Sequence, residues 1–286
     1  MVVQQHRAGG GARALRALAV AGVVAAAAGC AGDGGVDRAA AAADARDGAA
    51  EVVRRAASVL AGDGVASAEV STSMETAAGG TRVTIRGTGA YDFRAGSGRL
   101  KVVLPPDAAG EEEHRPITEL LAPGALYMMN RGAGVPAGKW VRIDTTTLED
   151  GNLVTGGVTD PLAAAELLRG AGAVTYVGET ELAGVTVRHY RGTADIGRAA
   201  RLAAPGSRAS LASAAKGFRA RTVPFDAYLD EEGRLRKVRH RFSFANEGPA
   251  AEVVSTTLLY GFGVPVAVRL PAERNIYTGE IEQGRA

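Results

Sequence analysis

The stretch that decides the fold is Thr81–Phe93, TRVTIRGTGAYDF, in which two kinds of residue alternate. Its odd positions carry valine, isoleucine, glycine, tyrosine and phenylalanine, whereas its even positions carry mainly arginine and threonine. A strand with one buried and one wet face produces this alternation, because successive side chains point to opposite sides. The glycines Gly87 and Gly89 interrupt an otherwise good strand, which fits a sheet that bends.

Runs of strand character continue on both sides of this stretch, and Gly-rich or charged turns link them. Asp230–Gly233, DEEG, is a strong hairpin turn of this kind. Period-two patterning starts at Val65, and about eleven strands are expected in all. After the first long strands, the expected strands are 99–104, 116–121, 125–130, 139–144, 174–182, 185–193, 223–229, 234–244 and 252–262, with weaker extended character over 264–277.

Three regions carry helical signals. Ala49–Leu60 has apolar residues at helical spacing, and Asp160 followed by Pro161 is an N-cap with proline at the first helical position. A third helical region, 195–203, resumes over 208–218. Strands in sequence order with segregated helices predict an α+β fold, a single strongly curved antiparallel sheet whose concave face is covered by helices.

The first residues form a leader that ends at Cys30, the only cysteine of the chain. A basic segment without acids precedes a short apolar run and small residues, which is typical of a secretory signal peptide. The apolar run is shorter than the roughly 20 residues that a membrane span needs. Ala27–Cys30 resembles a bacterial lipobox, so we expect a diacylglyceryl group and an N-acyl chain on Cys30. The alternative is an ordinary secretory signal cut near Ala28.

Composition then divides the chain into segments. We expect a signal peptide over 1–29, a flexible tether over 30–48 that is mostly Ala, Gly and Asp, a folded domain over 49–270 and a C-terminal tail over 271–286. Removal of the leader's three arginines changes the formal net charge from +2 to −1. A nearly neutral mature chain argues against the concentrated basic surface of a nucleic-acid-binding protein.

Five phrases of the sequence occur in an order that resembles a known family. They are ALYMM (125–129), GKWVRID (138–144), Asp160-Pro161 before a Leu-rich helix, VTVRHYRG (185–192) and VPFDAYLD (223–230). Over roughly 49–270 this order resembles the actinobacterial envelope lipoproteins of the LppX/LprG type, in the LolA-like carrier superfamily. The resemblance implies a half-open β-barrel whose concave face and helices enclose an apolar cavity for acyl chains, and no catalytic residues.

Such a cavity would be lined by apolar residues at alternating strand positions. The candidates are Val83, Ile85, Tyr91, Phe93, Tyr127, Met129, Val238, Phe242, Leu258 and Tyr260. The alternative is that these side chains fill the space between the sheet and the helices, since alternation alone does not distinguish a filled core from a cavity.

Three further segments of the sequence have both a functional and an ordinary interpretation. Lys237, Arg239 and Arg241 would share one strand face and could meet anionic lipid headgroups, although a solvated outer face is the ordinary interpretation. Ser213–Lys216 matches S-x-x-K, but without the partner motifs of penicillin-binding enzymes it indicates no hydrolase. Glu111–His114 reads as a charged loop, because consecutive residues cannot all face one metal ion.

The sequence therefore predicts a lipid-anchored, monomeric protein on the outer face of the cell membrane that binds or shuttles a lipid or glycolipid. We expect no catalysis, no cofactor, no metal and no nucleic-acid partner. The alternative is a lipid-anchored interaction or sensory module of the envelope with a filled core. An apolar cavity of roughly several hundred Å³ favours the carrier, and a filled interior favours the module.

Overall fold

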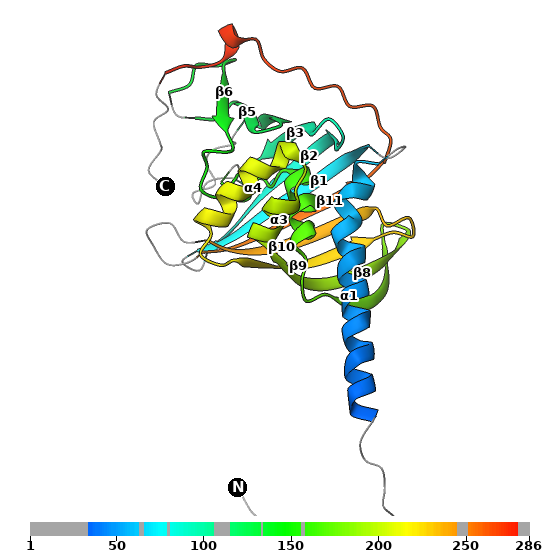
Figure 1. The fold of residues 1–286 in the computed structure, drawn as a ribbon. Helices are drawn as coiled ribbons and strands as arrows, with labels where there is room; N and C mark the ends of the chain where they lie inside the picture. The colour runs from blue at the N-terminus through cyan, green and yellow to red at the C-terminus, as the bar shows by residue number, and fades with distance from the viewer. Residues whose placement is uncertain are drawn as a thin grey trace, which may run out of the picture. The chain divides into compact units, whose positions relative to one another are not determined.

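The computed structural model describes residues 34–62, 66–78, 81–105, 115–132, 134–155, 158–244 and 251–279 (Figure 1). The leader, Cys30 and the charged loop 111–114 lie outside the described residues. Residues 41–286 form one compact unit.

In the described part of the chain, eleven strands form one antiparallel sheet with the order β6-β5-β4-β3-β2-β1-β11-β10-β9-β8-β7. Strands β1 to β6 run outward in sequence order, and β7 to β11 return from the opposite edge until β11 pairs with β1. The strands are β1 (Ser67–Ala78), β2 (Thr81–Asp92), β3 (Ser97–Val103), β4 (Ile117–Ala122), β5 (Ala125–Met129), β6 (Trp140–Asp144), β7 (Thr175–Leu182), β8 (Val185–Asp195), β9 (Thr222–Leu229), β10 (Leu235–Phe244) and β11 (Ala251–Tyr260).

Close contacts within the sheet require glycine at one position of β2 and one position of β3. A Cβ on Gly89 would overlap the carbonyl oxygen of Arg99, and a Cβ on Gly98 would overlap the ring of Tyr91. Gly98 pairs with Tyr91 across the two strands. The glycines therefore make room for the neighbouring backbone and for a large ring, besides permitting the sheet to bend.

The helices are α1 (Gly34–Leu60), α2 (Pro161–Leu167), α3 (Ile196–Leu202) and α4 (Pro205–Gly217), with 3₁₀ turns over Leu168–Gly170 and Glu273–Asn275. The side chain of Asp160 caps α2 by accepting hydrogen bonds from the amides of Leu162 (2.7 Å) and Ala163 (3.2 Å), as expected. Asp195 caps α3 in the same way, through the amide of Arg198 (2.6 Å).

The structure adds detail at both ends of the folded domain. The flexible tether predicted over 30–48 is helical from Gly34 onward, because alanine is the strongest helix former and this stretch is rich in it. The extended segment 264–277 does not join the sheet as a strand. It contacts the sheet through a bridge between Ile276 and Trp140, through a hydrogen bond from the hydroxyl of Ser67 to the carbonyl oxygen of Val264, and through Val268 and Ile276, which pack on the outer face.

One face of the sheet, called here the inner face, packs against the helices (Figure 1). The side chains of Val53 and Leu60 on α1 are fully buried in this core, as is every residue of α2. On the opposite, outer face, Tyr127 and its neighbours form a smaller cluster with Ile276 of the C-terminal segment. An open, curved antiparallel sheet with helices on one face confirms the predicted α+β class.

Candidate functional site

The predicted cavity residues divide between the two faces of the sheet. Strand register and burial place six of them on the inner face, under the helices: Val83, Ile85, Tyr91, Phe93, Val238 and Phe242. The register places the remaining four on the outer face: Tyr127, Met129, Leu258 and Tyr260.

The assignment of Leu258 and Tyr260 to the cavity was wrong because β11 carries apolar residues on both faces. Leu258 pairs with Lys237 of β10, whereas the inner positions of β11 include Ser255 and Thr257. The buried side of this strand therefore mixes these polar residues with Val253 and Leu259, and alternation of polarity could not reveal its orientation. Tyr127 was misplaced for a related reason, since the C-terminal segment buries the outer face of β5 as well.

The inner-face candidates form a packed core. Tyr91, Phe93, Val238 and Phe242 are almost fully buried, and they belong to the same cluster as the apolar residues of the helices. Val83 differs, because it lies near the start of β2 and is 41% exposed. The space between the helices and most of the inner face is therefore filled by side chains.

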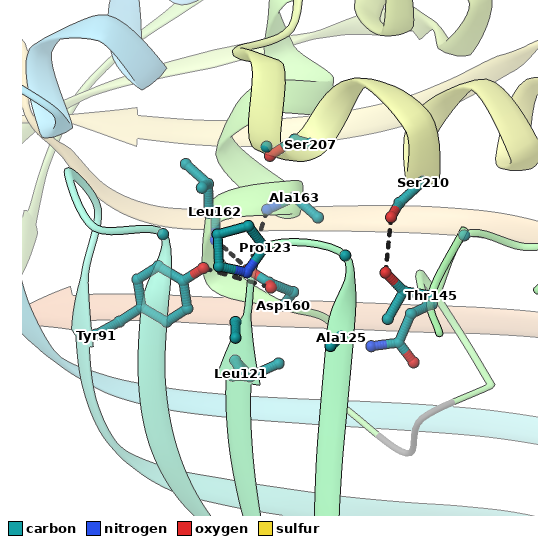
Figure 2. A pocket seen from close by; sticks show the side chains of 16 residues that line it. Tyr91, Leu121, Pro123, Ala125, Thr145, Asp160, Leu162, Ala163, Ser207 and Ser210 are labelled. Atoms are coloured by element: carbon teal, nitrogen blue, oxygen red, sulfur yellow. Dashed lines mark hydrogen bonds between the residues drawn. The ribbon is translucent and has the colours of Figure 1, made fainter. Parts of the chain in front are cut away.

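A small cavity of about 50 Å³ lies between the β4–β5 turn, the start of α2 and helix α4 (Figure 2). Asp160 lies on its wall and accepts a long hydrogen bond of 3.4 Å from the hydroxyl of Tyr91. Across the cavity, the hydroxyls of Thr145 and Ser210 lie 2.7 Å apart (Figure 2). Asn152 also lines the cavity, and its side-chain oxygen is buried without a hydrogen-bond partner.

Burial controls the acid–base properties of this cavity. Desolvation raises the pKa of Asp160, although the amides of Ala163 and Leu162 act in the opposite direction. Burial raises the pKa of Tyr91 well above its ordinary value, and the nearby Asp160 carboxyl raises it further. A space of this size holds a few water molecules or one small polar group, and it is too small for an acyl chain.

A larger and more apolar space follows α1 along the edge of the sheet. It has a volume of about 400 Å³ and is lined by residues of α1, β7 and β8, including Ala49, Val52, Tyr176 and Tyr190. An adjoining space of about 330 Å³ shares Val52 and Arg188 with it. We call the two spaces together the α1 groove.

The α1 groove combines apolar groups with several charged side chains: Arg188 lines both spaces, and Arg55, Glu231 and Glu232 line the smaller one. Tyr176 is 48% exposed, and its ring lies 5.5 Å from the ring of Tyr190. Arg188 donates a hydrogen bond to the carbonyl oxygen of Asp230 (3.1 Å), which holds its guanidinium beside the groove. Sequence reasoning missed this groove, because Tyr176 lies next to a β-bulge that breaks the alternation of β7.

Two titratable side chains are buried in the sheet with polar atoms that have no hydrogen-bond partner among the described atoms: one carboxyl oxygen of Glu119 and both ring nitrogens of His240. One is Glu119 on the inner face of β4, where burial raises the pKa to about 8 despite the lowering effect of Arg131. The other is His240 on the inner face of β10, where burial lowers the pKa to about 3. The sequence does indicate the burial of both residues. Glu119 and His240 each lie two positions from apolar residues of the same strand, and residues two apart share a strand face.

The remaining sequence motifs have structural explanations or no counterpart in the described residues. Ser213 of the S-x-x-K match donates its hydroxyl to the carbonyl oxygen of Thr146 (2.5 Å), so it ties α4 to a loop. Over the part of the chain that the structure describes, no three His, Cys, Asp or Glu residues gather as metal ligands would. None of the described helices has the length and apolarity that crossing a bilayer requires.

Several solved structures share this arrangement of strands and helices. LprF from Mycobacterium bovis has 12% sequence identity and a TM-score of 0.41, over 79% of this chain and 98% of that chain. The Mycobacterium tuberculosis lipoprotein LppX has 10% identity and a TM-score of 0.42, over 78% of this chain and 99% of that chain. MucB, from the Pseudomonas aeruginosa MucA/MucB complex, has 15% identity and a TM-score of 0.30, over 81% of this chain and 61% of that chain.

No family model matches the sequence, and no curated protein matches it either. At this identity and these TM-scores the likeness concerns the arrangement of the fold, and it carries nothing about a ligand of this chain.

Proposed function

We propose that the chain is an extracytoplasmic lipoprotein, held at the membrane through Cys30, that binds a lipid or glycolipid without catalysis. The observation that carries the proposal is the α1 groove, whose larger space of about 400 Å³ is open to solvent, is lined mainly by apolar groups and has the half-exposed Tyr176 on its wall. Ligand sites of proteins are mostly apolar and have volumes from about 300 Å³ upward. Exposed apolar groups gathered beside such a space are typical of a binding surface.

The composition of α1 supports a ligand that lies against this helix. The core-facing side of α1 includes Ala50, Ala56 and Ala57, each of which buries a single methyl group. Burial of one such group contributes only about 0.8 kcal/mol, so α1 is held less firmly than a leucine-rich helix. A small displacement of α1 would widen the groove, and Arg188 would then face the polar or anionic group of an amphiphile.

Ligand binding can be tested with a fluorescent fatty acid, cis-parinaric acid, and the mature chain carrying Cys30→Ser. We expect saturable binding, and we expect the double variant Val52→Ser/Tyr176→Ser to bind at least tenfold more weakly because it loses two apolar contacts. The control is Leu202→Ser/Leu270→Ser, which removes two leucines that are about as exposed as Tyr176 and lie away from the groove, and it should bind as the unchanged chain does.

A second function is favoured by a different observation, the packed inner face. If the unchanged chain does not bind the probe, or if both double variants bind it equally well, the carrier is contradicted. The filled core then favours a lipid-anchored interaction or sensory module of the envelope. Native mass spectrometry of the protein from its own membrane distinguishes the two functions independently, since a carrier should retain a bound lipid.

The anchor has a test of its own. Replacement of Cys30 by alanine in the full chain should abolish fatty-acid labelling and leave the protein unprocessed or released, because lipidation of this cysteine needs its thiol. Metabolic labelling with an alkyne fatty acid and fractionation after a high-salt wash give the result. A mature-size Cys30→Ala product that stays in the washed membrane fraction would contradict the anchor.

A further inference from the structure

A group of basic side chains lies on the outer face of the sheet, away from the α1 groove. Register places Lys237, Arg239 and Arg241 of β10 on this face, as expected from the sequence, and it adds His189 and Arg191 of β8. Strand β9 runs between them. We call these five residues the basic patch.

Asp226 of β9 organises the patch without neutralising it. Its carboxylate accepts hydrogen bonds from His189 (2.8 Å), Arg191 (2.9 Å) and Arg241 (2.9 Å). Burial raises the pKa of Asp226, but these hydrogen bonds together lower it below the ordinary value, so the carboxylate stays ionised. One buried negative charge thus holds several cations in place.

The side chains of Lys237 and Arg239 are less constrained. The ammonium of Lys237 lies over the ring of Tyr228 (5.1 Å), and that ring stacks on His189 at 4.4 Å. Arg239 forms no ion pair with any described residue, although Glu75 and Glu252 lie nearby at the end of the sheet, where Glu75 pairs with Arg82 (3.8 Å). The patch therefore keeps cationic groups that are available to an external anion.

The strand next to the patch presents apolar groups on the same face. Leu258 of β11 is the neighbour of Lys237 across the ladder, and Tyr260 follows it with 40% of its surface exposed. Tyrosine suits a place that is half apolar and half wet, and the stems of Lys and Arg can lie along apolar surface while their charges stay in water. Cations beside exposed apolar groups on an open sheet face match the chemistry of an anionic bilayer surface.

We propose that the outer face of β8 to β11 binds the surface of an anionic lipid bilayer through the basic patch, with Leu258 and Tyr260 at the level of the headgroups. Each lysine or arginine near such a surface strengthens binding roughly fivefold. The contact would orient a lipid-anchored chain on its membrane. It does not depend on ligand binding in the α1 groove, which lies on the other side of the sheet.

Vesicle flotation tests the proposal with the mature chain carrying Cys30→Ser, which has no acyl chain. We expect the protein to float with phosphatidylglycerol–phosphatidylcholine vesicles at low salt, to stay behind with pure phosphatidylcholine, and to dissociate in about 0.5 M salt. The double variant Lys237→Glu/Arg239→Glu should bind at least tenfold more weakly. The matched control Arg99→Glu/Lys101→Glu makes the same charge change on β3 and should keep its binding within about threefold.

Three results would overturn the proposal: equal binding to both kinds of vesicle, an equal loss in both variants, or no vesicle binding together with retention on immobilised polyglutamate. The last result would assign the patch to an acidic protein. The variant Lys237→Gln/Arg239→Gln removes the two positive charges without adding negative ones, so it is less disruptive to folding. It should show a smaller loss of vesicle binding. These variants should bind cis-parinaric acid as the unchanged chain does. This result would show that the loss of vesicle binding is independent of ligand binding in the α1 groove.

Discussion

Replacing Glu119 with glutamine should raise the free energy of unfolding by roughly 3 kcal/mol at pH 7 and change it little at pH 4.5. Burial raises the pKa of Glu119 from 4.5 to about 8, so the folded protein keeps this carboxyl protonated at pH 7. The unfolded chain ionises it. Unfolding therefore releases a proton, and folding stability is lost as the pH rises from about 4.5 to about 8.

Glutamine resembles the protonated carboxylic acid in shape, and it has no proton to release on unfolding. The difference in unfolding free energy between Glu119→Gln and the unchanged protein should grow by about 1.4 kcal/mol per pH unit up to about pH 8 and then level off. Urea unfolding at pH 4.5, 6, 7 and 8 measures it. The same change at exposed Glu231 is the control, with an expected effect below about 0.5 kcal/mol.

A pH-independent difference, or one that shrinks toward pH 8, would show that Glu119 is ionised in the folded protein. The nearby charges act in opposite directions, since Arg131 lowers the pKa of Glu119 and Asp160 raises it. Arg131→Gln should therefore enlarge the benefit of Glu119→Gln, because it removes the charge that favours ionisation.

How much of the fold was predictable depends on whether one face of each element was purely apolar. Strand β2 has such a face, and the Asp160–Pro161 pair defines a helix start through local chemistry alone, so both were placed correctly. Strand β11 has leucine on both faces, with Ser255 and Thr257 on the buried one beside Leu259, so its orientation is set by its neighbours. No pattern within a single strand contains that information.

The candidate site was less predictable because it depends on contacts between distant segments. The α1 groove joins Val52 of the first helix to Tyr176 and Arg188 of two later strands. Whether an alternating apolar face is filled or open depends on the volume of the helices packed on it, here largely alanine-faced α1 and fully buried α2. The pattern of a strand indicates which face is buried, but it does not indicate the shape of the helices that cover this face.

Replacing His240 with leucine should have the opposite pH dependence from Glu119→Gln. Burial lowers the pKa of His240 from 6.5 to about 3, so its imidazole is neutral in the folded protein and gains a proton on unfolding below pH 6.5. The unchanged protein therefore loses stability from this group as the pH falls from 6.5 toward 3. Relative to the unchanged protein, His240→Leu should gain roughly 2 kcal/mol between pH 7 and pH 5.

The change with pH, not the offset at one pH, is the diagnostic quantity, because leucine also repacks the contacts of His240 with Phe225 and Phe242. Phe242→Leu, two residues along the same face, alters packing without removing a titratable group and should shift stability equally at both pH values. Urea unfolding of the three proteins at constant ionic strength gives the comparison. An equal shift at pH 7 and pH 5 for His240→Leu would contradict a buried neutral imidazole.

The two buried groups together make a stronger test than either alone. Between pH 4.5 and pH 6.5 the folded protein holds one proton more than the unfolded chain at Glu119 and one fewer at His240, so their effects on stability cancel. In this window Glu119→Gln should make stability rise with pH relative to the unchanged protein, and His240→Leu should make it fall. The double variant should restore the pH dependence of the unchanged protein. That pattern of signs requires both side chains to be buried and uncharged in the same folded state, which is the packed inner face.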